Sequence, residues 1–70
     1  MSTEQFDQRK IGLLIERREH LGLSQRDLEE RMGVSERMVA KWESRIRQPT
    51  AANLDRWARA LGLQVVLRRQ

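Results

Sequence analysis

Residues 22–43, GLSQRDLEERMGVSERMVAKWE, decide the fold of this chain. Within this stretch, Ser24 and Asp27 have the spacing of the N-cap and N3 residues of a capping box. Gly33 directly follows Met32, the last apolar residue of this segment, and glycine tolerates the left-handed conformation that ends a helix. The pattern therefore predicts a short helix over about residues 24–32.

A second helix is expected directly afterwards, over about residues 35–44. Ser35 is a favourable N-cap residue, and Val39 and Trp42 follow at helical spacing. Only Gly33 and Val34 separate the two helices, so they must meet at a steep angle. Such a pair lets the second helix project into a DNA groove about 12 Å wide while the first helix crosses the phosphates.

Further elements are expected on both sides of this pair. A helix over about residues 4–20 precedes it, and a helix over about 50–61 follows it. An apolar stripe marks the later helix: Leu54, Trp57, Ala58 and Leu61. The β-branched, partly alternating segment over about 63–69 favours a strand. We expect one domain, residues 1–70, with an all-α fold of four helices and a short C-terminal β-strand.

Composition narrows the function without deciding it. The chain has 70 residues and a net charge of +4, which suits nucleic acid, an acidic protein or an anionic membrane equally well. It has no cysteine and only one histidine, His20, so we expect no disulfide, no zinc site and no cofactor. Because no apolar run reaches about 20 residues and no signal-peptide pattern is present, we expect a cytoplasmic protein without a membrane span.

An ordered set of motifs within about residues 11–62 resembles the Cro/cI-type (XRE-like) helix-turn-helix family. The motifs are Gly22–Leu28, Met32–Ser35, Val39–Glu43, Pro49 and Leu54–Gly62. The resemblance implies a lambda-repressor-like domain that binds double-stranded DNA in the major groove.

The resemblance also implies which residues contact bases: Ser35, Glu36, Arg37 and Lys41. Arg37 suits a bidentate contact with guanine, and Glu36 could accept a hydrogen bond from a cytosine amino group. Lys41 lies one turn beyond Arg37 on the same helix face. The alternative is a solvated face on which these charges only pair with one another.

Phosphate contacts are expected from Gln25, Arg26, Arg45 and Arg47. Gln25 matches the glutamine with which the family holds a phosphate, and the amide groups of the helix start would share that phosphate. The alternative is that Gln25 is an ordinary residue of the first helical turn.

Other matching residues are expected to have structural roles. The family pairs an arginine of the first helix with a glutamate after the recognition helix, which implies an ion pair between Arg18 and Glu43. Trp42 and Trp57 could stack on bases, but their helical spacing with apolar residues favours the core.

Two residues depart from the family pattern. Glu29 stands where the family usually has alanine, and its carboxylate is expected to tilt the joint or turn into solvent. Arg45 stands where glycine is favoured, so it must adopt a strained backbone or lengthen the helix.

The C-terminal segment suggests a partner. No second strand is expected in the chain, and an unpaired apolar strand is a liability unless another chain covers it. We therefore expect a homodimer interface formed by Leu63, Val65, Val66 and Leu67. The alternative is a frayed tail.

The leading functional hypothesis is a homodimeric transcriptional repressor that recognises an inverted repeat. The alternative is an antitoxin that neutralises a partner toxin protein and regulates its own operon. Enzymatic activity is not expected, because the sequence has no phosphate loop, metal cluster or nucleophilic triad.

Overall fold

The computed structural model describes residues 3–64, with side chains from residue 8 onward. It contains four helices: α1 (Thr3–His20), α2 (Gln25–Met32), α3 (Met38–Glu43) and α4 (Ala51–Ala60). No strand occurs within residues 3–64. The predicted four-helix, all-α arrangement is therefore confirmed for the part of the chain that the structure describes.

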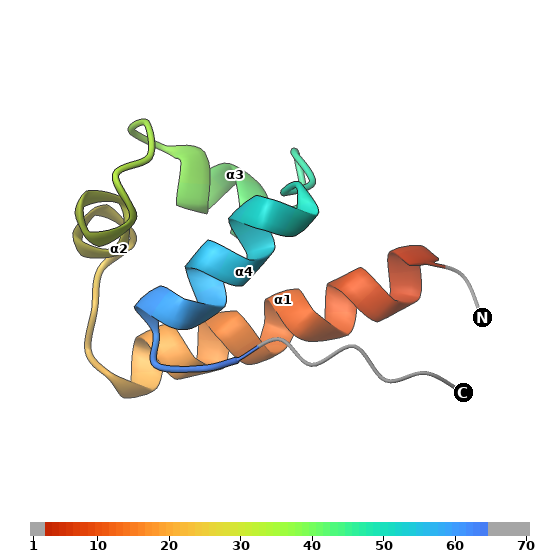
Figure 1. Cartoon of the computed structure of the whole chain (residues 1–70), viewed down its shortest axis with the longest axis horizontal. Helices are drawn as coiled ribbons and strands as arrows, with labels where there is room; N and C mark the ends of the chain where they lie inside the picture. The colour runs from red at the N-terminus through yellow and green to blue at the C-terminus, as the bar shows by residue number, and fades with distance from the viewer. Residues whose placement is uncertain (1–2, 65–70) are drawn as a thin grey trace.

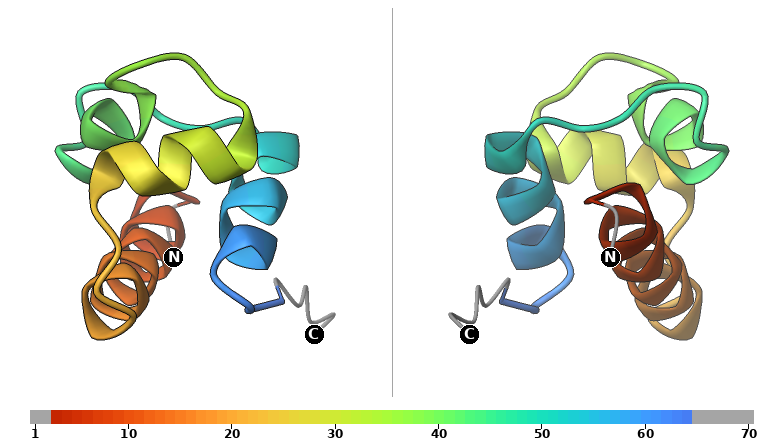
Figure 2. Two further views of the ribbon diagram at one scale, coloured as in Figure 1. Left: turned by 90° about the vertical axis from the view of Figure 1, so that its left-hand side faces the viewer. Right: turned by 90° about the vertical axis from the view of Figure 1, so that its right-hand side faces the viewer.

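The four helices surround a common core. α1 lies along one side of the molecule, and α4 lies beside it (Figures 1 and 2). α2 runs across one end of both helices, with α3 beside it at the upper edge (Figure 2). α2 contacts both α3 and α4, and α1 contacts α3. The joint between α2 and α3, residues 33–37, stands at the opposite end of the molecule from the start of α1 (Figure 1).

The ends of α2 are fixed by the residues that the sequence indicated. The Ser24 hydroxyl accepts a hydrogen bond from the Asp27 amide at 2.9 Å, and the Ser24 amide donates to the Asp27 carboxylate at 3.0 Å. Gly33 ends the helix with φ of 70°, a left-handed conformation that strains other residues. The capping box and the glycine stop are thus confirmed.

The capping box gives α2 a pH dependence. The Ser24 amide and hydroxyl groups hydrogen-bond the Asp27 carboxylate and hold its pKa below the ordinary value of 3.8. A carboxylate with a lowered pKa stabilises the fold above its ordinary value, and the contribution is lost as the pH falls through the folded-state pKa. We expect Asp27→Ala to destabilise the protein at neutral pH but not below the folded-state pKa, where wild type has lost the same contribution. Urea unfolding of both chains across this range measures the difference, and a gap that stays constant would contradict the assignment.

The core lies between all four helices, each of which contributes buried apolar residues. Trp42 of α3 and Trp57 of α4 are almost fully buried, and their ring centroids are 5.3 Å apart at a tilt of 31°. Both tryptophans therefore belong to the core. The remaining buried apolar residues are Ile11, Leu14, Leu28, Met32, Val39, Ala58 and Leu61.

The C-terminal strand is not seen. Leu63 and Gln64 follow α4 without strand structure, and Leu63 packs partly buried against the core. Val65, Val66 and Leu67 lie outside the described residues. The predicted strand therefore remains a prediction for the part beyond residue 64.

Candidate nucleic-acid interface

The start of α3 differs from the expectation. A helix capped by Ser35 was predicted, whereas α3 begins at Met38 and its N-cap is Arg37. Arg37 has φ of 68° and makes no side-chain capping bond. The left-handed conformation costs a non-glycine residue about 1–2 kcal/mol, so another interaction must stabilise this turn.

That interaction comes from Glu29 of α2. Its carboxylate accepts a hydrogen bond from the Val39 amide at 2.9 Å, which caps α3 from the side. Glu29 is 6% exposed, so the expectation that its carboxylate turns into solvent is wrong. The physical reason is that the orphan amide at the start of α3 needs an acceptor in a buried place.

Arg45 adopts a strained backbone and does not lengthen α3, which was the other expectation for this residue. α3 ends at Glu43, and Arg45 follows in a left-handed turn with φ of 65°. Its guanidinium donates to the Glu43 carbonyl at 3.0 Å and to the Gln8 carbonyl of α1 at 3.5 Å. The predicted phosphate-contacting residue is thus held against the protein's own backbone.

Arg18 and Glu43 form an ion pair below the joint. The Arg18 Nε atom lies 2.7 Å from one carboxylate oxygen of Glu43, and its Nη2 atom lies 3.0 Å from the other. This carboxylate holds the pKa of Arg18 above its usual value. The third Arg18 nitrogen, Nη1, donates to the Leu23 carbonyl at 2.8 Å, so the pair fixes α1, the α1–α2 turn and α3 together.

Gln25 belongs to the same network. Its Nε2 atom donates to the Glu43 carboxylate at 2.9 Å, while the residue occupies the first position of α2 as expected. The structure therefore places Gln25 both at the helix start and against the buried ion pair.

Four of the residues that were predicted to contact DNA line a shallow depression between α2 and α3. Gln25, Arg26, Glu36 and Arg37 line it, together with Glu29 and Ala40. Arg26 lies 4.0 Å from Glu36 and 3.9 Å from Glu30, and all three side chains are mostly exposed.

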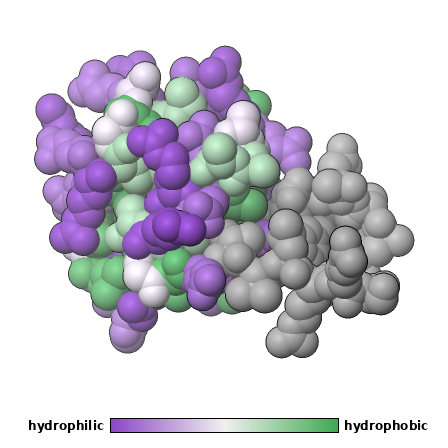
Figure 3. Space-filling model, viewed as in Figure 1, coloured by the Kyte–Doolittle hydropathy of each residue, from purple (hydrophilic) through white to green (hydrophobic). Residues whose placement is uncertain are grey.

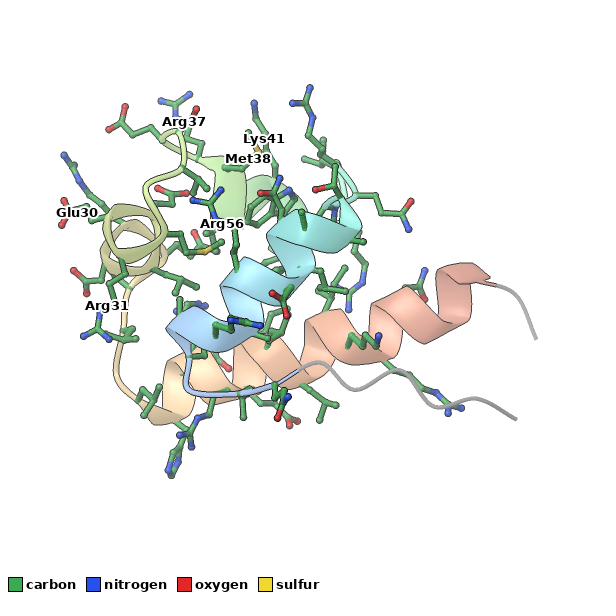
Figure 4. All side chains as sticks on the ribbon, in the orientation of Figure 1. Glu30, Arg31, Arg37, Met38, Lys41 and Arg56 are labelled. Carbon is green, nitrogen blue, oxygen red and sulfur yellow. The ribbon has the colours of Figure 1, made fainter. Side chains whose placement is uncertain are left out.

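Lys41 extends this surface along α3. Its amide donates to the Arg37 carbonyl at 3.0 Å, so the two residues are one turn apart. Arg37 and Lys41 lie on the same edge of the molecule and point away from α1 (Figure 4). Hydrophilic residues gather over α2 and α3 along this edge (Figure 3). Ser35 and Arg47 are also exposed, although they do not line the depression.

A family comparison identifies this arrangement. A sequence model described as helix-turn-helix matches residues 14–67. The chain belongs to this family. It is a Cro/cI-type, XRE-like regulator that binds DNA. Searches of curated proteins and of solved structures gave no match.

This helix-turn-helix regulator also contains a hydrogen bond between α4 and the end of α2 that was not predicted from the sequence. Arg56 of α4 donates to the Met32 carbonyl at 2.8 Å, which satisfies an orphan carbonyl at the end of α2. Arg56 reaches across from α4 (Figure 4). No local pattern could reveal this contact, because the two residues lie 24 positions apart.

Within residues 3–64, no helix has the length and apolar character needed to cross a bilayer. In the same part of the chain, no group of three or more acidic or histidine side chains is arranged to hold a metal ion.

Proposed function

We propose that this regulator is a sequence-specific repressor that inserts α3 into the major groove of double-stranded DNA. The observation that carries the proposal is the exposed edge on which Arg37 and Lys41 stand one turn apart. Both cations point away from the core and have no ion pair within the described residues, so they are available to a ligand. Ser35 and Glu36 extend the proposed base-reading set on the exposed turn before α3.

Phosphate contacts are proposed on both sides of this edge. Gln25 and Arg26 flank it at the start of α2, where the free amide groups of the helix favour an anion. Arg45 and Arg47 flank it after α3. For Arg45, a phosphate would take those guanidinium N–H groups that do not bond the two carbonyls.

The proposed working unit is a homodimer. Leu63 is partly buried at the end of the described chain, and the apolar Val65, Val66 and Leu67 follow it in the sequence. Pairing of these segments between two chains would present two copies of α3 about one helical turn of DNA, roughly 34 Å, apart. Such a dimer binds an inverted repeat and can block transcription by occupying the site.

One experiment tests these statements together. Selection of binding sites from a random duplex library with the purified protein should yield an inverted repeat with two half-sites. Enrichment of a single half-site would argue against the dimer. Equal competition by the selected and the random duplex would overturn sequence-specific recognition.

Arg37→Ala tests the base-reading role. Loss of a bidentate arginine–guanine contact should weaken binding by about 1–3 kcal/mol and relax the preference at one base pair of each half-site. Gel-shift titrations on the selected duplex and on single-base variants measure both effects. Equal weakening on every duplex, with a salt slope lower by about one, would make Arg37 a phosphate contact instead.

A further inference from the structure

Glu29 connects three parts of the α2–α3 joint. Its backbone carbonyl accepts hydrogen bonds from the Gly33 amide at 2.9 Å and from the Val34 amide at 3.2 Å. Its side-chain carboxylate accepts from the Val39 amide at 2.9 Å. One buried residue of α2 therefore holds the end of its own helix, the turn and the start of α3.

The Glu29 carboxylate takes the place of a backbone acceptor in the first turn of the expected helix. In an α-helix that began at Ser35, the Val39 amide would donate to the Ser35 carbonyl, four residues earlier. Here the Ser35 carbonyl accepts instead from the Met38 amide at 3.2 Å, and Val39 is bonded to Glu29. Residues 35–37 are thus released from the helix, and Arg37 takes its left-handed conformation.

The backbone of Arg37 determines where its side chain points. A residue in the left-handed region directs its Cα–Cβ bond differently from a residue in a right-handed helical turn. A bidentate contact with a guanine edge requires the guanidinium in one narrow orientation. The acceptor that holds Val39 therefore also controls the approach of Arg37 to a base.

We propose that Glu29 is a positioning residue that sets the DNA sequence preference of this regulator through the backbone of Arg37. The inference rests on the proposed recognition of DNA by α3. Glu29 needs no contact with DNA for this role, and its side chain is more than nine-tenths buried.

Two substitutions at this position separate positioning from charge. In Glu29→Ala, the Val39 amide loses its acceptor, and we expect α3 to extend back toward Ser35. The preference for the selected duplex over a random duplex should fall by about tenfold, the size of one good base contact. Affinity for random duplex should change by less than about twofold, because phosphate contacts dominate it. Glu29→Gln should keep the preference, because its amide oxygen accepts the same hydrogen bond.

Gel-shift competition measures the two affinities, and the amide-to-Hα coupling of Arg37 in NMR spectra reports its φ angle. Glu30→Ala is the matched control, because Glu30 is the neighbouring carboxylate and its side chain is 72% exposed. This control should leave both the preference and the coupling unchanged.

Two outcomes would overturn the proposal. One is an unchanged preference in Glu29→Ala, including the case in which both affinities fall equally. The other is a Glu29→Gln chain as impaired as Glu29→Ala. If Glu29→Ala fails to fold, as judged by circular dichroism, the Glu29→Gln chain decides. Loss of the preference in Glu29→Gln would then assign Glu29 to the fold alone. The failure of the proposed function looks different, because wild type itself would then show no preference between the two duplexes.

Discussion

Glu43→Ala should lower the free energy of unfolding by about 3–5 kcal/mol, because it leaves the charge of Arg18 buried without a counter-ion. The Arg18 and Glu43 side chains are only 13% and 8% exposed, so water cannot replace the lost carboxylate. The substitution also removes the acceptor of the Gln25 side chain. Small domains are stable by only about 5–15 kcal/mol, so a large share of the fold's stability is lost. Urea unfolding followed by tryptophan fluorescence measures the change.

Glu36→Ala is the matched control for this substitution. Glu36 is also a carboxylate, but its side chain is 77% exposed and it lies 4.0 Å from Arg26. Exposed ion pairs contribute about 0–1 kcal/mol, so the control should unfold almost like wild type. A Glu43→Ala chain as stable as Glu36→Ala would show that the Arg18–Glu43 pair does not hold the helices together.

The double variant Arg18→Met, Glu43→Leu distinguishes a buried charge from lost packing. Replacement of both members of a buried pair by apolar residues is often neutral, whereas removal of one partner is costly. We expect the double variant to be more stable than Glu43→Ala. An additive loss would instead indicate that each side chain contributes mainly through its own packing.

Local sequence patterns were sufficient to predict most of the helices and their caps. Ser24, Asp27 and Gly33 lie within one short segment, and each acts on a backbone group a few residues away. The apolar spacing of Trp57, Ala58 and Leu61 likewise follows from the period of a single helix. Such features depend on neighbours in the sequence, and therefore the sequence alone predicts them.

The start of α3 could not be predicted in this way. Ser35 has the properties of an N-cap, yet α3 begins at Met38 because the carboxylate of Glu29 holds Val39. This competition depends on the angle between two helices, which local propensity does not contain. The contact between Arg56 and the Met32 carbonyl depends on tertiary packing in the same way. Arg18 and Glu43 were paired only through the family resemblance, since nothing in their spacing of 25 residues indicates a contact.

Trp57→Ala should lower the free energy of unfolding by about 3–5 kcal/mol, because it opens a cavity at the centre of the core. Trp57 is 0% exposed and packs against Trp42 of α3, so its ring joins α4 to the helix that carries the proposed base-reading edge. A relaxed core would also let α3 shift relative to α2. Urea unfolding monitored by circular dichroism measures the loss, and it avoids a signal that depends on the substituted tryptophan.

Trp57→Phe separates the volume of this side chain from its polar atom. The indole N–H of Trp57 is buried and has no hydrogen-bond partner within the described residues. A phenyl ring therefore gives up no hydrogen bond with those residues and keeps an aromatic face toward Trp42. We expect Trp57→Phe to cost only about 1–2 kcal/mol, the cost of a small residual cavity. A loss as large as that of Trp57→Ala would contradict this interpretation, since it would mean that the indole N–H makes a stabilising bond. Because an unpartnered buried N–H is itself unfavourable, the smaller ring is also the substitution at this site that the core should tolerate best.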